Sequence, residues 1–195
     1  MKQLTILIDM DDTIENFCET LVEVLNERHA LKVKTDDIRE WDLTKAFPSL
    51  APRDIFSPTY EEDFWKRVKP LPGAVDCLRR MTDDGHSVVI VTASAPESVP
   101  LKIKLCLRRY FPFIKRENII IASRKQLIKG DIMIDDAPHN LIGGDYLRVL
   151  MQANHNRDYD AASNGMMRVD GWEGAYQIVK MYADILGQTY ADIKE

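Results

Sequence analysis

Three carboxylates follow the first apolar run of the chain. Asp9, Asp11 and Asp12 come directly after residues 4–8, which read Leu-Thr-Ile-Leu-Ile. Carboxylates crowded at the end of a buried strand repel one another and resist burial, so a chain that places them there needs a compensating cation. A hard cation such as Mg²⁺ prefers oxygen ligands of this kind. The cluster therefore predicts a divalent metal site.

A second acidic pair, Asp135 and Asp136, follows a second apolar run at residues 132–134. Two acidic strand ends that are distant in sequence can meet at one metal ion when both strands end at the same edge of a sheet. We expect Asp9 and Asp135 to be metal ligands, with the backbone carbonyl of Asp11 as a third. Asp136 would lie behind them and orient a metal-bound water. Such a site indicates phosphate chemistry.

Two of the carboxylates have the spacing that a covalent phosphoryl transfer needs. Asp9 is the candidate nucleophile, because a carboxylate can attack phosphorus and split one difficult displacement into two easier ones. Asp11 lies two residues further on and would face the same side if the strand continued. It could protonate the leaving oxygen and then accept a proton from the attacking water. Asp12 faces the other way and is expected to form local hydrogen bonds, while Thr13 is expected to stabilise the turn.

Candidate phosphate-binding groups follow two later apolar runs. Thr92 ends one run, and the small residues after it would let backbone amides approach a phosphate, so the Thr92 hydroxyl and the Ala93 amide are candidate donors. Lys125 follows the next run and could offset the negative charge of the phosphoryl group. The alternative for Lys125 is an exposed surface position, the usual fate of lysine. Lys102 and Lys104 lie on an expected amphipathic helix and are predicted to be surface residues, one of which could still reach the phosphate.

The elements that must position these residues alternate between strands and helices. The predicted strands are β-branched, nearly continuous apolar runs, as in a parallel sheet covered on both faces; they span residues 4–8, 88–91, 119–122, 132–134 and 147–151. Amphipathic helices are predicted between and after them, at residues 74–84, 99–110 and 172–186. This alternation predicts an α/β fold with a Rossmann-like, doubly wound parallel sheet. Ligands bind such sheets beyond the carboxyl ends of the strands, where both acidic clusters lie.

One segment, residues 15–69, interrupts the alternation because it contains no convincing strand. Helices are predicted at residues 15–30, 36–46 and 61–68, with a proline-punctuated loop between the last two. The segment begins just after the first acidic cluster, so we predict a helical cap inserted over the site. The catalytic core would then comprise residues 1–14 and 70–195. The alternative is that these helices simply pack on a face of the sheet.

Composition limits the class of protein. The chain has 195 residues, a hydrophobic content of 45% and a net charge of −5, which argues against a partner such as a nucleic-acid polymer. The cysteines, Cys18, Cys77 and Cys106, are widely spaced among apolar residues and predict free thiols in a reducing compartment. The N-terminus enters a strand at once, without a signal peptide, and no apolar run approaches the roughly 20 residues that span a bilayer. We therefore expect a cytoplasmic protein with no membrane partner.

The series of motifs resembles the haloacid dehalogenase (HAD) superfamily of phosphohydrolases. Its four motifs match, in order, the run from Asp9 to Thr13, then Thr92, then Lys125, then the pair Asp135-Asp136. The resemblance implies a Rossmann-like core, an Mg²⁺ cofactor, Asp9 as the nucleophile and Asp11 as the general acid and base.

Within that superfamily the chain is similar to the 5′(3′)-deoxyribonucleotidase group. The similarity is carried by the stretch 64–74, where cap and core would join, and by the arrangement from Lys125 to Asp135-Asp136. It implies a small phosphorylated substrate, a deoxynucleoside or nucleoside monophosphate. Phe17 falls where the group carries an aromatic residue that stacks on the nucleobase.

The chain also departs from this group at some positions of the substrate site. The group often has a polar residue where this chain has Ala93, so one side-chain contact to the phosphate is missing, although the amide remains. Trp41 and Trp65 are candidates for the base pocket, but we expect both to lie in the core of the cap. A phosphatase of another small phosphomonoester is therefore an alternative.

A signalling receiver domain is a second alternative, from a different class of protein. Receiver domains also combine an acidic pair, a phospho-accepting Asp, a Thr and a Lys on a doubly wound sheet. Here the position that would carry the phospho-accepting Asp is occupied by Val91-Thr92, and the insertion 15–69 has no counterpart. The enzyme is therefore preferred. The oligomeric state stays open, a homodimer included.

Overall fold

The computed structural model describes residues 2–192, with side chains placed up to residue 188; Met1 and residues 193–195 of the predicted core lie outside the described residues. Its centre is a sheet of six parallel strands in the order β3-β2-β1-β4-β5-β6. The strands are β1 (Thr5–Ile8), β2 (Ser87–Thr92), β3 (Ile119–Ile121), β4 (Ile132–Asp135), β5 (Leu147–Met151) and β6 (Met167–Val169). The Rossmann-like α/β fold predicted from the sequence is confirmed.

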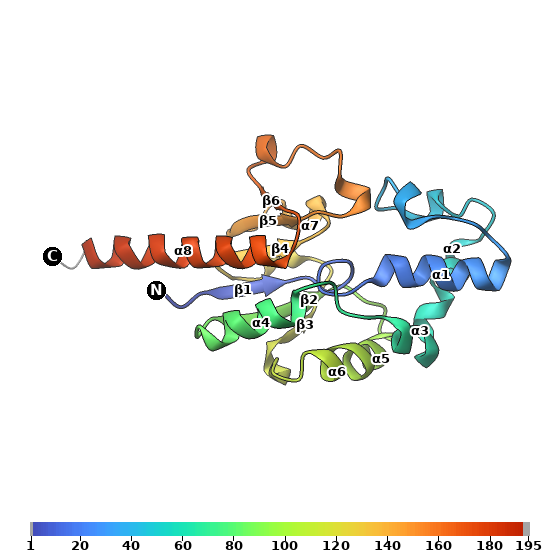
Figure 1. The fold of residues 1–195 in the computed structure, drawn as a ribbon, viewed down its shortest axis with the longest axis horizontal. Coiled ribbons are helices and arrows are strands. Elements are labelled where there is room, and N and C mark those ends of the chain that lie inside the picture. Colours follow the sequence, from blue (N-terminus) through green and yellow to red (C-terminus); the bar gives the residue numbers. More distant parts are fainter. Residues whose placement is uncertain (1, 193–195) are drawn as a thin grey trace.

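Eight α-helices surround or extend this sheet in the described part of the chain (Figure 1). They are α1 (Phe17–His29), α2 (Pro52–Phe56), α3 (Glu62–Arg67), α4 (Ala74–Asp83), α5 (Val99–Lys102), α6 (Arg108–Tyr110), α7 (Pro138–Leu141) and α8 (Trp172–Asp192). No helix in the described range is long and apolar enough to cross a membrane.

The two faces of the sheet are covered unequally. Side chains alternate along each strand, so Ile6 and Ile8 of β1 join the larger apolar core, whereas Leu7 joins the smaller one. The larger core includes buried residues of α4, α8 and the 15–69 segment. The smaller core is closed by α7 and by loop residues such as Ala161 and Met166. Burial on both faces explains why the strands read as continuous apolar runs.

Several predicted elements differ in the structure. The helix predicted at 36–46 is wrong, since only the 3₁₀ turns Thr35–Asp37 and Leu43–Lys45 form there. Conversely, the proline-rich loop contains α2 and the 3₁₀ turn Ser57–Tyr60, because proline is accommodated in the first turn of a helix, where its missing N–H has no partner to lose. The helix predicted at 99–110 is interrupted by a π-helical stretch, Ile103–Leu107.

The 15–69 segment lies beyond the carboxyl ends of the strands (Figure 1). It leaves the sheet immediately after β1 and returns through an isolated β-bridge between Glu15 and Pro70. It also contacts the loop after β5, where the Asn154 side chain donates a hydrogen bond to the Thr35 carbonyl at 3.0 Å. The segment is thus held to the core at more than one place.

Candidate active site

The ends of β1 and β4 bring the two acidic clusters together. The two strands pair directly, with Ile8 opposite Ile134, and the Asp9 amide donates to the Ile134 carbonyl at 2.9 Å. One carboxylate oxygen each from Asp9, Asp135 and Asp136 lies within 4.8 Å of the others. The convergence expected for Asp9 and Asp135 is therefore present, with Asp136 beside them.

Lys125 lies between the first two of these carboxylates. Its ammonium donates to Asp135 Oδ2 at 2.7 Å and to Asp9 Oδ1, and its side chain is buried. Although burial lowers the pKa of this lysine, the Asp9 and Asp135 carboxylates raise it above its ordinary value overall. Lys125 thus carries a positive charge at the floor of the site and is no surface residue.

The electrostatics of the cluster favour additional positive charge. Burial raises the pKa of Asp135 to about 6, with the Asp9 charge adding to the effect and Lys125 opposing it. Burial, followed by the charge of Asp135, raises the pKa of Asp136 well above its ordinary value. Raised carboxylate pKa values mean that the ionised forms lack sufficient compensation from the protein alone.

A divalent cation fits this donor set. Asp9, Asp135 and Asp136 offer hard oxygen atoms within one small volume, which is the chemistry that Mg²⁺ prefers. Lys125 is the one cation hydrogen-bonded to that group among the described residues. The Asp11 carboxylate is not part of this group, and its Oδ2 accepts from another lysine, Lys102; the role in metal binding that we predicted for Asp11 falls to its backbone carbonyl.

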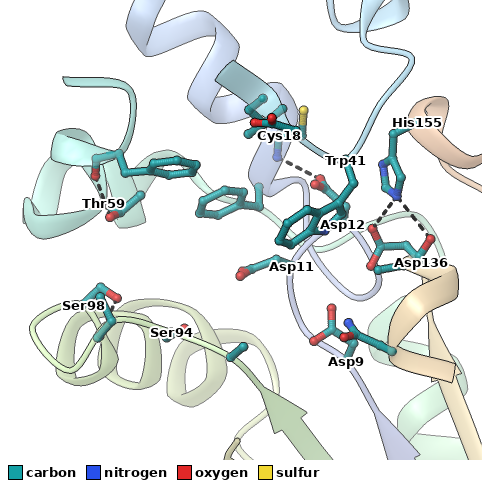
Figure 2. A pocket seen from close by; sticks show the side chains of 18 of the residues that line it. Asp9, Asp11, Asp12, Cys18, Trp41, Thr59, Ser94, Ser98, Asp136 and His155 are labelled. Carbon is teal, nitrogen blue, oxygen red and sulfur yellow. Dashed lines mark hydrogen bonds and ion pairs between the residues drawn. The ribbon is translucent and has the colours of Figure 1, made fainter. Parts of the chain in front are cut away.

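A tight turn redirects the chain after Asp9. Strand β1 ends at Ile8, the amide of Ile14 donates to the Met10 carbonyl at 2.9 Å, and Asp12 adopts a left-handed backbone conformation with φ 54°. Asp residues tolerate this conformation better than most. The turn, and not a continued strand, therefore directs Asp9 and Asp11 into one cavity (Figure 2).

Asp12 forms a local hydrogen bond, as expected, whereas the Thr13 side chain reaches Asp136 instead of stabilising the turn. The Asp12 carboxylate accepts a hydrogen bond from the Cys18 amide at 2.8 Å and so caps the first turn of α1. Burial raises the pKa of Asp12 to about 7, although this hydrogen bond opposes the shift. The Thr13 hydroxyl donates to Asp136 Oδ1 at 2.9 Å and accepts from the Asp136 amide at 3.1 Å. Thr13, the last residue of the first motif, thus holds Asp136 in place.

Lys102 lies in the site rather than on the surface, which corrects our expectation. Its side chain is buried, and its ammonium donates to Asp11 Oδ2 at 2.7 Å, Thr92 Oγ1 at 2.7 Å and Ser94 Oγ at 3.0 Å. Lys104 faces solvent, with its ammonium 3.7 Å from a Glu62 carboxylate oxygen. The two lysines of one helix thus have different surroundings.

A cavity of about 490 Å³ opens above the carboxylates. Its floor includes Asp9, Asp11 and Lys125, and the Ala93 and Ser94 loop forms one wall. The 15–69 segment supplies aromatic and apolar residues to the opposite wall: Phe17, Trp41, Leu43, Phe56, Tyr60 and Trp65. The cavity therefore has a charged floor and a largely aromatic and apolar wall, to which Glu40 and Asp42 also contribute.

The two tryptophans differ from each other. Trp65 is buried, as expected, and its indole N–H donates to the Thr59 carbonyl at 2.8 Å. Trp41 is 63% exposed, so the expectation that it lies in the core of the segment is wrong. Its ring packs edge-on against His139, with 4.8 Å between centroids. Because its loop forms no helix, Trp41 lies at the mouth of the cavity.

Three polar residues near the site were not singled out in the sequence. Asn140 donates to Asp135 Oδ1 at 3.1 Å. His155 Nε2 lies 3.3 Å from Asp136 Oδ2, and burial lowers the pKa of this histidine. Ser94 lines the cavity wall beside Ala93. Asn140 and Ser94 are near the motifs in sequence, whereas nothing in the sequence links His155 to Asp136.

Comparisons with known proteins agree with this geometry. The family model described as 5′ nucleotidase, deoxy (pyrimidine), cytosolic type C protein (NT5C) matches residues 2–186. The chain is 30% identical to a 5′(3′)-deoxyribonucleotidase of Bacillus subtilis over 174 residues, covering 89% of this chain and 96% of the relative. It is 28% identical to a 5′(3′)-deoxyribonucleotidase of Clostridium acetobutylicum over 192 residues, covering 95% of this chain and 100% of the relative.

Solved structures share the fold at lower identity. A HAD-family hydrolase from Deinococcus radiodurans, with bound phosphate and sodium, aligns with a TM-score of 0.63 at 13% identity, covering 91% of this chain and 95% of that one. A magnesium-bound HAD hydrolase from Bacillus subtilis aligns with a TM-score of 0.56 at 17% identity, covering 91% and 99%. Since the family model spans most of the sequence, the chain belongs to the NT5C family of 5′-nucleotidases and is a phosphomonoester hydrolase, not a receiver domain.

Proposed function

We propose that the chain hydrolyses deoxynucleoside monophosphates in an Mg²⁺-dependent reaction that passes through an aspartyl-phosphate on Asp9. The observation that carries this proposal is the cavity itself, whose charged floor and aromatic wall match the two ends of a nucleotide. Cavities of roughly 300–1,000 Å³ are typical of small-molecule sites. The two deoxyribonucleotidase relatives support the choice of substrate class.

The residues have distinct roles in this proposal. Asp9, Asp135 and Asp136 would hold Mg²⁺ together with the Asp11 carbonyl; when bound, the ion neutralises phosphate charge and orients the phosphoryl group. An Asp9 carboxylate oxygen forms a bond to phosphorus while the bond from phosphorus to the ester oxygen breaks. Asp11 gives its proton to the departing oxygen and later takes one from the attacking water, which restores the Asp9 carboxylate and the protonated form of Asp11.

Lys125 and the β2 loop would bind the phosphoryl group. Lys125 uses two of its three N–H donors on Asp9 and Asp135, so a third is available for a phosphate oxygen. The Ala93 amide is the candidate backbone donor of the loop, as predicted, and Ala93 lines the cavity. Thr92 is buried behind this wall and does not line the cavity, so its hydroxyl, which accepts from Lys102, would shape the loop rather than donate to the phosphate as we expected.

The 15–69 segment would act as the cap. Phe17 enters the cavity from the first turn of α1 and packs edge-on against Phe64, with 5.5 Å between ring centroids. A ring fixed in this way could stack on a nucleobase, and the apolar wall would exclude water from the reaction. Trp41 at the mouth would cover the base from the other side.

A turnover screen tests the proposal directly. Purified protein with Mg²⁺ is given deoxynucleoside and ribonucleoside monophosphates, with sugar phosphates as controls, and released phosphate is measured. We expect multiple turnovers on deoxynucleotides and none after chelation of Mg²⁺ or in Asp9→Asn, whose folding is checked by circular dichroism. Faster turnover of sugar phosphates would reassign the substrate, and retained turnover in Asp9→Asn would remove Asp9 as the nucleophile.

A further inference from the structure

Lys102 is buried, although it was expected on the surface or in contact with the phosphate. It lies on a helical stripe with Ser98 and Cys106, and all three are buried. It is the last residue of α5, directly before the π-helical stretch Ile103–Leu107. Single π-helical turns inside α-helices often occur at functional sites.

The ammonium of Lys102 has no donor left for a substrate. A lysine ammonium carries three N–H groups. The structure assigns one each to Asp11 Oδ2, Thr92 Oγ1 and Ser94 Oγ, at 2.7, 2.7 and 3.0 Å. Lys125 differs, because only two carboxylates accept from it. Lys125 therefore has one N–H group left for a substrate, and Lys102 has none.

Lys102 also lies behind the cavity wall. Asp11 and Ser94 line the cavity, whereas neither Lys102 nor Thr92 is among the described residues that do so. The ring of Trp65, which lines the cavity, has its centroid 5.7 Å from the Lys102 ammonium. In Figure 2 the Asp11 carboxylate extends from its loop towards the side of the cavity that carries Ser94. Any effect of Lys102 on a substrate must therefore pass through the residues it holds.

We propose that Lys102 is a positioning residue that fixes the Asp11 carboxylate towards the reacting phosphoryl group. The Asp11 carboxylate is thereby directed away from the group formed by Asp9, Asp135 and Asp136, which it does not join. The inference rests on the proposed function, in which Asp11 carries out the proton transfers.

The test compares Lys102→Met with Lys104→Met, a matched control on the neighbouring exposed lysine. For a deoxynucleoside monophosphate, Lys102→Met should lower kcat by roughly 100-fold, the order expected when a reacting group is misplaced by about 1 Å. KM and the inhibition constant of inorganic phosphate should change less than about 3-fold, since no phosphate donor is lost. A tenfold rise in both constants with kcat retained would instead make Lys102 a phosphate ligand and overturn the proposal.

A substrate with a good leaving group separates positioning from general damage to the fold. With 4-nitrophenyl phosphate, nitrophenolate leaves with its electron pair and needs no proton, so phosphorylation of Asp9 stays fast. Hydrolysis of the phosphoenzyme still needs Asp11 to take a proton from water. Lys102→Met should therefore give a burst of about one nitrophenolate per active site, followed by slow turnover. A burst reduced in amplitude in proportion to the folded fraction would show a structural role only.

A double-mutant cycle with Asp11→Asn completes the test. If Lys102 acts through Asp11, the two losses in steady-state rate should not multiply, and Lys102→Met should cost less than about 3-fold in the Asp11→Asn background. Multiplying losses would contradict the proposal. Should Lys102→Met fail to fold, Lys102→Arg keeps the charge but not the three convergent donors, so it should show the burst with a smaller loss in kcat. Wild-type kcat without a burst in Lys102→Arg would also overturn it.

The proposed function and the role of Lys102 can fail separately. If the wild-type protein releases no phosphate from deoxynucleoside monophosphates, or if Asp9→Asn remains active, the proposed function is wrong. If the wild-type protein passes both tests while Lys102→Met behaves like Lys104→Met, only the role of Lys102 is wrong.

Discussion

Replacing Lys125 by methionine should destabilise the metal-free protein strongly. The side chain is 2% exposed and contacts Asp9 and Asp135, which are 6% and 0% exposed. Methionine fills a similar volume but leaves both carboxylates without their cation. Removing one partner from a buried ion pair costs about 3–5 kcal/mol, because the remaining charge stays buried and uncompensated. For a domain of this size each kcal/mol shifts Tm by roughly 2–4 °C, so Tm should fall by roughly 6–20 °C.

Magnesium should partly restore this loss. In Lys125→Met the group of Asp9, Asp135 and Asp136 has lost its hydrogen-bonded ammonium, so it should bind Mg²⁺ more tightly and gain more stability from it than the wild-type site does. Differential scanning fluorimetry with and without Mg²⁺ measures both effects. The control is Lys104→Met, an exposed change expected to move Tm by only about 1–2 °C.

Two results would refute this reasoning. A Tm fall for Lys125→Met no larger than that of the control would show that the buried ion pairs do not stabilise the site. An equal Mg²⁺-induced rise in Tm for wild-type and variant proteins would show that the lysine and the metal do not share the same carboxylates. Lys125→Met should lose activity whether or not this reasoning is correct, so the test depends on stability and not on turnover.

Two further predictions concern the proton balance and the aromatic wall. Burial, followed by the Asp11 charge, raises the pKa of Glu15 well above its ordinary value, so the stability that this group contributes is complete below about pH 4.5 and is lost as pH rises through the folded-state pKa. Urea unfolding should therefore show a smaller loss of stability between pH 5 and 8 for Glu15→Gln than for the wild-type protein, and parallel curves would contradict the assignment. Phe17→Ala should raise KM for deoxynucleotides by roughly 5- to 100-fold, as loss of base stacking implies, and leave KM for glycerol phosphate unchanged; equal rises for both would exclude stacking.

The parts of the site that follow directly from apolar strand ends could be predicted from the sequence. Asp9 and Asp135 each end a buried run, and parallel neighbouring strands place such ends at one edge of a sheet. Lys125 follows the same logic, because its position after β3 places it at that edge. Strand β6 was missed because three residues, two of them only half-buried, give too short a pattern.

The position of Lys102 could not be predicted from the reasoning applied to the sequence, because lysine is usually exposed on amphipathic helices. A signal was nevertheless present, since Ser98 and Cys106 lie four residues before and after it on the same stripe. The exposure of Trp41 had no such signal. It depends on residues 36–46 forming separate turns, and on a contact with His139 that is far away in the sequence.

The identity of the phosphorylated residue tests the central claim most directly. The enzyme is mixed with a deoxynucleoside monophosphate and Mg²⁺, quenched in acid during turnover and reduced with borohydride, which converts an aspartyl phosphate to homoserine. Mass spectrometry of the peptides then locates the change. We predict homoserine at position 9, at higher yield in Asp11→Asn, where hydrolysis of the intermediate is slowed. Substrate turnover with an unmodified Asp9, or with homoserine at another aspartate, would contradict it.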